Sequence, residues 1–187
     1  MKVIGIVGRK DSGKTQLILR VIPELSARGL RVSTVKNAHH HNLEFDHPGK
    51  DSYLHRAAGA AEVMVVSDDE WAIVGRHAPR PSLQDLLRKL SPCDLVLVEG
   101  YKSEISLPRI EVWRPGATCT AESHAAPLAV EDAGIVAVAC PRSAPPVGMG
   151  ALRLDLDDTQ AISSFLLDVA NSLLPLTRHS TRTPALA

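Results

Sequence analysis

The segment Gly8-Arg9-Lys10-Asp11-Ser12-Gly13-Lys14-Thr15 constrains the fold more than any other part of this chain. It matches in full the pattern GxxxxGK(S/T), which describes a phosphate-binding loop. The preceding residues, Val3 to Val7, are β-branched and apolar around one glycine, which predicts a buried strand of a parallel sheet. The following residues, Thr15 to Arg28, carry apolar side chains at helical spacing, and Pro23 predicts a kink or an early break. The loop therefore lies where phosphate binding requires it, between a strand and a helix.

Each residue type in this loop has a chemical reason. The glycines let the backbone curl so that its N–H groups point at phosphate oxygens, and the helix N-terminus adds partial positive charge. Lys14 can bridge the β- and γ-phosphates, and the Thr15 hydroxyl can ligate Mg²⁺. The predicted nucleotide contacts from the loop are Gly8, Arg9, Lys10, Asp11, Ser12, Gly13, Lys14, Thr15 and Gln16.

The rest of the chain alternates strands with helices. We expect further strands at Val32–Lys36, 62–66, 71–75, 94–98, 110–113 and 135–139, and helices at 51–60, 82–90 and 158–174. The two strands at 62–66 and 71–75 predict a hairpin turning at Asp68-Asp69. Asp51 or Ser52 is the expected N-cap of the helix at 51–60, and Ser82 is the expected N-cap of the helix at 82–90. This order predicts an α/β, P-loop NTPase-like three-layer fold with a mainly parallel sheet and a β excursion in the second half.

Composition excludes several classes of protein. The 187 residues favour one domain, predicted over 1–174, with 105–132 as an insertion or dimer arm and 175–187 as a disordered tail. Lys+Arg and Asp+Glu both number 21, which disfavours a nucleic-acid partner. No apolar run of about 18 residues predicts a membrane span, and no secretory signal is evident, so a cytoplasmic location is expected. Cys93, Cys119 and Cys140 lack metal or disulfide spacing and predict buried or half-buried thiols.

Acidic residues at strand ends are the candidates for holding the metal. Asp94 begins and Glu99 follows the apolar strand at 94–98, and ligands gather at the carboxyl ends of parallel strands, which favours Glu99. Asp46, in the loop after the strand at Val32–Lys36, is the expected second contact to magnesium or water. The predicted metal ligands are thus Thr15, Asp46 and Glu99, and the predicted catalytic residues are Lys14, Asp46 and Glu99.

The same loop carries further polar groups. Lys50 is positioned to neutralise phosphate charge on the nucleotide or on a second substrate. His39, His40, His41 and His47 leave three interpretations open: polar substrate contacts, solvated loop residues, or zinc ligands. Consecutive histidines point in different directions, which disfavours a closed zinc site.

Several segments together make the chain resemble the MobB-type molybdopterin-guanine dinucleotide biosynthesis adapter proteins. They are the loop at 8–15, Val35-Lys36 with His39-His40, the run Asp46-His47-Pro48-Gly49-Lys50-Asp51-Ser52, the run Arg56-Ala57-Ala58-Gly59-Ala60, the run Leu95-Val96-Leu97-Val98-Glu99-Gly100-Tyr101-Lys102, and Leu107-Pro108-Arg109-Ile110-Glu111-Val112. The phosphate loop is widespread, whereas the PGKDS segment and the VEGYK and PRIEV pair are far more specific. The resemblance is strong over about residues 1–113 and weak beyond.

The resemblance implies a GTP-binding accessory protein with slow Mg²⁺-dependent hydrolysis. Such proteins work beside the guanylyltransferase that joins GMP to molybdopterin, are similar to the P-loop class and form homodimers. By position, Lys14 and Thr15 take the phosphate and magnesium roles and Glu99 the acidic role. Asp46, Lys50, Asp51 and Ser52 belong to a second motif that faces the nucleotide or the pterin.

Two departures from related dimeric proteins limit what carries over. Arg9 stands where some relatives have a signature lysine after the first glycine, so catalysis in trans by that residue is not implied. No NKxD motif recognises guanine, and Cys140-Pro141-Arg142-Ser143 occupies the place of such a base loop. GTP over ATP is therefore implied by resemblance alone. The alternatives are a small-molecule kinase or ATP-dependent ligase of the dethiobiotin-synthetase type, and a metallochaperone GTPase.

Overall fold

The structure, a computed structural model, describes residues 1–38, 46–75, 80–102, 104, 106–116, 126–145 and 150–174. The chain divides into two compact units. One comprises residues 1–37 and 90–187, and the other comprises residues 38–89. The predicted tail at 175–187 and the residues His39 to His41 lie outside the described part of the chain.

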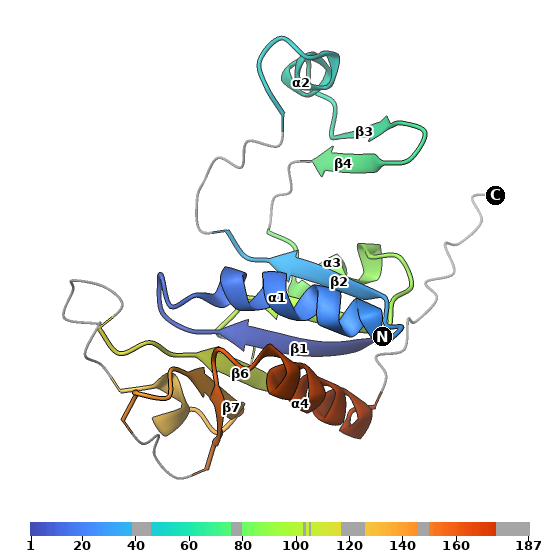
Figure 1. Cartoon of the computed structure of the whole chain (residues 1–187). Coiled ribbons are helices and arrows are strands. Elements are labelled where there is room, and N and C mark those ends of the chain that lie inside the picture. Colours follow the sequence, from blue (N-terminus) through green and yellow to red (C-terminus); the bar gives the residue numbers. More distant parts are fainter. Residues whose placement is uncertain are drawn as a thin grey trace. The chain divides into compact units, whose positions relative to one another are not determined.

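The first unit is built on a six-stranded sheet in which every neighbouring pair is parallel. The strand order is β2-β5-β1-β6-β7-β8 (Figure 1). The strands are β1 (Lys2–Val7), β2 (Val32–Lys36), β5 (Leu95–Glu99), β6 (Arg109–Val112), β7 (Ile135–Cys140) and β8 (Leu152–Asp155). The predicted α/β class and parallel sheet are confirmed, and all six carboxyl ends lie along one edge of the sheet.

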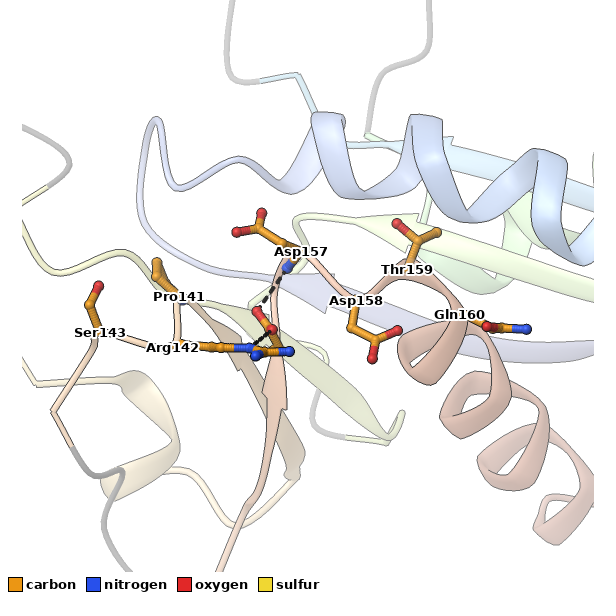
Figure 2. Close-up of a pocket in the computed structure, with 8 residues that line it drawn as sticks. Pro141, Arg142, Ser143, Asp157, Asp158, Thr159 and Gln160 are labelled. Carbon is orange, nitrogen blue, oxygen red and sulfur yellow. Dashed lines mark hydrogen bonds and ion pairs between the residues drawn. The ribbon is translucent and has the colours of Figure 1, made fainter.

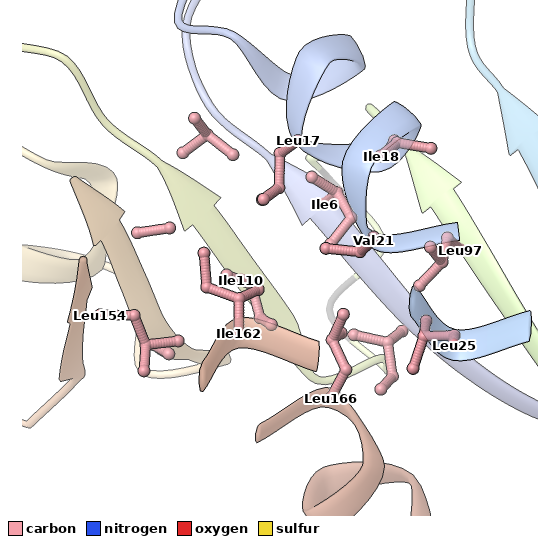
Figure 3. Packing of buried hydrophobic residues seen from close by; sticks show 14 of the residues in the cluster. Ile6, Leu17, Ile18, Val21, Leu25, Leu97, Ile110, Leu154, Ile162 and Leu166 are labelled. Carbon is pink, nitrogen blue, oxygen red and sulfur yellow. The ribbon is translucent and has the colours of Figure 1, made fainter. Parts of the chain in front are cut away.

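Helices α1 (Lys14–Ala27) and α4 (Thr159–Ser172) cover one face of this sheet and pack against each other. Their apolar stripes meet inward-facing strand residues, with Leu17 and Val21 of α1 near Ile6 and with Ile162 of α4 near Ile110 (Figure 3). Each such side chain contributes about 1.5–3 kcal/mol of burial free energy, so this layer fixes α1 on the sheet. The start of α1 is thereby fixed beside the end of β1.

Two features of these elements differ from the expectations. Pro23 lies inside α1 without the early break that was one of its two predicted effects, since the helix continues to Ala27. Strand β8 was not expected at all, because its four residues alternate with charged side chains and follow a Gly- and Pro-rich stretch. The strand is formed through its backbone pairing with β7, which no pattern within its own short sequence predicts.

The second unit contains α2 (Asp51–Ala57), β3 (Glu62–Val66), β4 (Trp71–Gly75) and α3 (Leu83–Lys89). The predicted hairpin is confirmed, since β3 and β4 pair antiparallel. The residue that caps α2 is Lys50, without a side-chain hydrogen bond, so the expectation of Asp51 or Ser52 as cap was wrong. Ser82 does cap α3, where its hydroxyl accepts from the Asp85 N–H at 3.2 Å.

The stretch predicted as an insertion, 105–132, contains β6 and a short 3-10 helix, η2 (Leu128–Val130). Its residues 117–125 lie outside the described part. Among the residues that the structure describes, the strand pair separate from the main sheet is β3–β4, which lies between β2 and β5 in the sequence. Across the described ranges, no helix is long and apolar enough to cross a membrane.

Candidate nucleotide-binding site

The loop between β1 and α1 has the curled backbone that the sequence predicts. Gly8 and Gly13 have positive φ angles of 144° and 98°, and Asp11 has a φ of 58°. Gly13 forms the N-cap of α1, and no side chain caps the first turn. The first N–H groups of α1 are therefore available to an anion, and the partial positive charge of the helix end favours one there.

The side chain of Lys14 folds back onto the phosphate loop. Its Nζ donates to the Arg9 carbonyl oxygen at 2.6 Å. Burial lowers the pKa of the Lys14 ammonium, Glu99 and Asp11 oppose that shift, and the cations Lys102 and Lys36 add to it. A polyphosphate would supply the negative charge that this half-buried ammonium lacks.

The other loop residues differ in exposure. Lys10, Asp11 and Gln16 are exposed, whereas Ser12 is buried and its hydroxyl has no hydrogen-bond partner among the described residues. Arg9 turns toward η2, and its Nη2 lies 3.4 Å from the Ala126 carbonyl oxygen. The Ser12 hydroxyl and Arg9 Nε, which is also buried without a hydrogen-bond partner among the described residues, are polar groups of this loop that a ligand could satisfy.

Thr15 and Glu99 come together although 84 residues separate them. The Thr15 hydroxyl donates to Glu99 Oε1 at 2.9 Å, because β5 is the neighbour of β1 and ends at the same edge. Asp94 lies at the opposite end of β5, where it accepts from the Arg31 N–H at 2.8 Å. A hydroxyl and a carboxylate side by side are the oxygen ligands that Mg²⁺ takes in phosphate-loop proteins, so these two residues fit the metal.

Lys36 is a member of this site that sequence reasoning missed. Its Nζ lies 3.2 Å from Thr15 Oγ1 and 3.3 Å from Glu99 Oε1. A signal for it existed, since Lys36 ends β2 and the strand-end rule that selects Glu99 also selects Lys36.

Asp46 and the pair Thr15 and Glu99 belong to different units of the chain. Asp46 belongs to the second unit, where its carboxylate accepts from the Ser52 hydroxyl at 3.0 Å and pairs with Arg56 at 3.5 Å. Lys50 belongs to the same unit and precedes α2. Their predicted roles toward metal and phosphate stay predictions.

Two buried polar residues of the PRIEV segment were not recognised from the sequence. The side chain of Arg109 is 2% exposed and donates to the Lys102 carbonyl and to Asp132, at 2.8 and 2.7 Å. Glu111 is fully buried and accepts the N–H groups of Leu128 and Ala129 at 2.9 and 3.0 Å. Burial raises the pKa of the Glu111 carboxyl against the effect of those hydrogen bonds. Both residues hold loops against β6.

A pocket of about 760 Å³ lies beside the ends of β7 and β8 (Figure 2). Its lining residues are Pro141, Arg142, Ser143, Asp155, Asp157, Asp158, Thr159 and Gln160. Arg153 shapes one wall, because its guanidinium donates to the carbonyl oxygens of Pro141, Arg142 and Ala144.

The carboxylates of this pocket are engaged to different degrees. Asp155 pairs with Arg142, whose hydrogen bond lowers the pKa of the Asp155 carboxyl, and also accepts from the Asp157 N–H. Asp158 caps α4 through a 2.9 Å bond from the Ala161 N–H. Asp157 has the loosest contact of the three, at 3.9 Å from Arg20 of α1. Arg20 also donates to the Leu156 carbonyl at 2.6 Å, so the helix that starts at the phosphate loop contacts the pocket wall.

The family model for molybdopterin guanine dinucleotide synthesis protein B, MobB, matches residues 3–141. This chain belongs to the MobB family. Two molybdopterin-guanine dinucleotide biosynthesis adapter proteins are similar to it at 36% identity. The one from Escherichia coli matches over 161 residues, 84% of this chain and 86% of the relative, and the one from Haemophilus influenzae over 167 residues, 88% and 86%.

Solved MobB structures share the fold. A crystal structure of molybdopterin-guanine biosynthesis protein B aligns with a TM-score of 0.67 at 30% identity, covering 90% of this chain and 99% of the other. The MobB homologue from Bacillus stearothermophilus aligns with a TM-score of 0.66 at 27% identity, covering 92% and 100%. The six-stranded sheet and the additional hairpin are thus those of the MobB family.

Proposed function

We propose that this protein binds GTP with Mg²⁺ and acts as an adapter in the synthesis of molybdopterin guanine dinucleotide. In this role it assists the guanylyltransferase that joins GMP to molybdopterin, and it hydrolyses GTP slowly. Membership of the MobB family and the names of the two similar adapter proteins support the pathway. The observation that carries nucleotide binding is the curled loop at 8–15 that leads into an uncapped helix.

Each phosphate contact has a defined donor in this proposal. The N–H groups of Gly13, Lys14 and Thr15 bind the β-phosphate, and the Lys14 ammonium exchanges the Arg9 carbonyl for phosphate oxygens. The exchange is favourable because a charged acceptor replaces a neutral one. The side chains of Arg9, Lys10 and Gln16 border the same phosphates.

Thr15 and Glu99 would hold the magnesium ion, directly or through water. Bound Mg²⁺ neutralises negative charge on the β- and γ-phosphates. Where the contact is through water, the Glu99 carboxylate would accept a hydrogen bond from that water and orient it toward the phosphates. Asp46 is proposed as a second contact to the metal or its water, and Lys50 as a phosphate contact.

The pocket beside β7 and β8 is the proposed site of the purine ring. It opens at the same edge of the sheet as the phosphate loop, and Arg20 connects it to α1. The N1–H and 2-amino groups of guanine can donate together to one carboxylate, whereas adenine presents an acceptor at N1. Asp157 is the carboxylate with the loosest contact here, which favours GTP over ATP.

The proposed partners are the guanylyltransferase, molybdopterin and a second copy of this chain. One face of the β3–β4 hairpin supports self-association, because Met64, Val66, Trp71 and Ile73 share that face and are all exposed. Contiguous exposed apolar side chains of this kind mark interaction surfaces. Sedimentation velocity on the isolated protein tests the dimer, which a monomer at micromolar concentration would contradict.

Titration calorimetry with GTP, ATP and GDP, with and without Mg²⁺, tests the nucleotide part. We expect Mg²⁺-dependent binding with GTP preferred, and absence of binding by all three would overturn the proposal. Sedimentation with the guanylyltransferase of the same organism tests the adapter part. We expect a complex that GTP strengthens, and the absence of any complex would remove the adapter role.

A further inference from the structure

The side chain of Lys36 bridges the two residues that fit the metal. Lys36 and Glu99 are register partners on the parallel strands β2 and β5, so the backbone itself brings their side chains together. Lys36 Nζ lies 3.2 Å from Thr15 Oγ1 and 3.3 Å from Glu99 Oε1. The hydroxyl and the carboxylate are themselves 2.9 Å apart. One ammonium group thus contacts both oxygens at once.

The two members of this ion pair differ in their freedom to move. The Glu99 side chain is 12% exposed, whereas that of Lys36 is 56% exposed. A carboxylate this far buried needs a counter-charge, while an exposed lysine can swing into water at little cost. The cation is therefore the exchangeable partner and the carboxylate the fixed one.

We propose that Lys36 is a tethered cation that neutralises Glu99 in the nucleotide-free protein and that Mg²⁺ displaces when nucleotide binds. The inference rests on the proposed function, because it takes Thr15 and Glu99 as the magnesium ligands. It adds that the Lys36 ammonium, a cation of the chain itself, competes with Mg²⁺ for these two oxygens.

An ammonium and a divalent cation cannot share these two oxygens. Mg²⁺ binds oxygen at about 2.0–2.1 Å in a strict octahedron, and its charge repels an ammonium held at hydrogen-bond distance. Lys36 must therefore leave before the metal binds. Free Mg²⁺ then binds weakly, whereas Mg²⁺ that arrives with a nucleotide gains phosphate ligands and displaces the lysine.

Binding of Mn²⁺ to the nucleotide-free protein, followed by the electron paramagnetic resonance signal of the free ion, tests this. Mn²⁺ serves as the probe because it takes the same oxygen ligands. Lys36→Gln should raise Mn²⁺ affinity about tenfold, equivalent to about 1.4 kcal/mol. Adding Glu99→Gln to that variant should abolish the gain. Lys36→Arg keeps the charge and should bind Mn²⁺ like the wild type.

Lys89→Gln is the matched control. Lys89 and Glu62 form an ion pair of similar length, 3.2 Å, and this substitution removes the same charge away from Thr15 and Glu99 in the sequence. It should leave Mn²⁺ affinity unchanged. Thermal melting of every variant checks that each is folded.

The outcomes separate this inference from the proposed function. One outcome is that Lys36→Gln binds Mn²⁺ no more tightly than the wild type, while the wild type binds Mg²⁺-GTP. In that case the proposal of a tethered cation is wrong, and the proposed nucleotide site stands. If Lys36→Gln loses GTP affinity without gaining Mn²⁺ affinity, Lys36 is a phosphate ligand and the inference is also overturned. If neither protein binds Mn²⁺ or GTP, both proposals fail.

Discussion

Gly8 lies so close to Val112 that a Cβ atom at Gly8 would be 2.4 Å from the Val112 carbonyl oxygen. The same atom would be 2.8 Å from the Ser12 hydroxyl. Because β1 and β6 are neighbours, the start of the phosphate loop packs directly against the end of β6. The obstacle is backbone, which cannot rotate away, so the loop depends on glycine at this position.

Gly8→Ala is therefore expected to distort the loop and to reduce GTP affinity at least about a hundredfold. Gly29→Ala is the control, since Gly29 also has a positive φ, of 84°, but nothing within 4 Å of an added Cβ. The control should show only the cost of backbone strain, about 1 kcal/mol. Calorimetry with Mg²⁺-GTP and thermal melting measure both effects. Full GTP affinity in Gly8→Ala would show that the loop does not bind phosphate.

Lys14→Ala should weaken triphosphate binding by about 3 kcal/mol, more than a hundredfold, because charge-assisted hydrogen bonds to phosphate are lost. The fold should persist, since the ammonium contacts only the Arg9 carbonyl among the hydrogen bonds of the described residues. Lys89→Ala removes an equal charge from the second unit and should leave affinity unchanged. Equal GTP affinity in Lys14→Ala and the wild type, by calorimetry, would remove Lys14 from the site.

Asp157→Asn should lower the preference for GTP over ATP about tenfold, because one oxygen that accepts from guanine is replaced by a donor amide. ATP affinity should change little. Asp168→Asn, a change of the same kind on the exposed side of α4, is the control. Competition titrations with both nucleotides give the ratio, and an unaltered ratio would place the base elsewhere.

Glu111→Ala should destabilise the fold by about 2–4 kcal/mol, because the N–H groups of Leu128 and Ala129 lose their buried acceptors. Its effect on GTP affinity should be smaller than that of Lys14→Ala, because the hydrogen bonds of Glu111 go to Leu128 and Ala129 and it acts on the phosphate loop only through the charge of Arg9. Urea denaturation gives the free energy of unfolding. A loss below 0.5 kcal/mol would mean that η2 is held by other contacts.

Glu111 also predicts a pH dependence of stability. Burial raises the pKa of this carboxyl above its ordinary value of 4.5, so the folded state binds the proton more tightly than the unfolded state does. The contribution of Glu111 to stability is therefore full below pH 4.5 and falls as pH rises through the folded pKa. The difference in unfolding free energy between wild type and Glu111→Gln should decrease over that range. A constant difference would contradict the raised pKa.

Much of the site could be predicted from local sequence. The loop at 8–15 needs only its own glycines and the neighbouring strand and helix, so its pattern specifies its structure. Glu99 could be placed because the carboxyl ends of parallel strands share an edge, whatever the strand order. The hairpin β3–β4 and the last helix also have periodic patterns that require no knowledge of distant partners.

Other features depended on contacts between distant segments. Lys36 meets Glu99 because β5, which is distant from β2 in the sequence, pairs with β2 in the register Lys36↔Glu99. The burial of Arg109 and Glu111 depends on Asp132 and on the N–H groups of η2, which no local pattern couples to β6. Strand β8 exists because β7 offers it an open edge.

Local periodicity and backbone chemistry were enough to predict the loop at 8–15, the parallel α/β class and the acidic residue that ends β5. The cation that lies beside Glu99 and the set of buried polar side chains depend instead on contacts between distant segments. Strand order and register bring those groups together, and both are set by packing over the whole sheet.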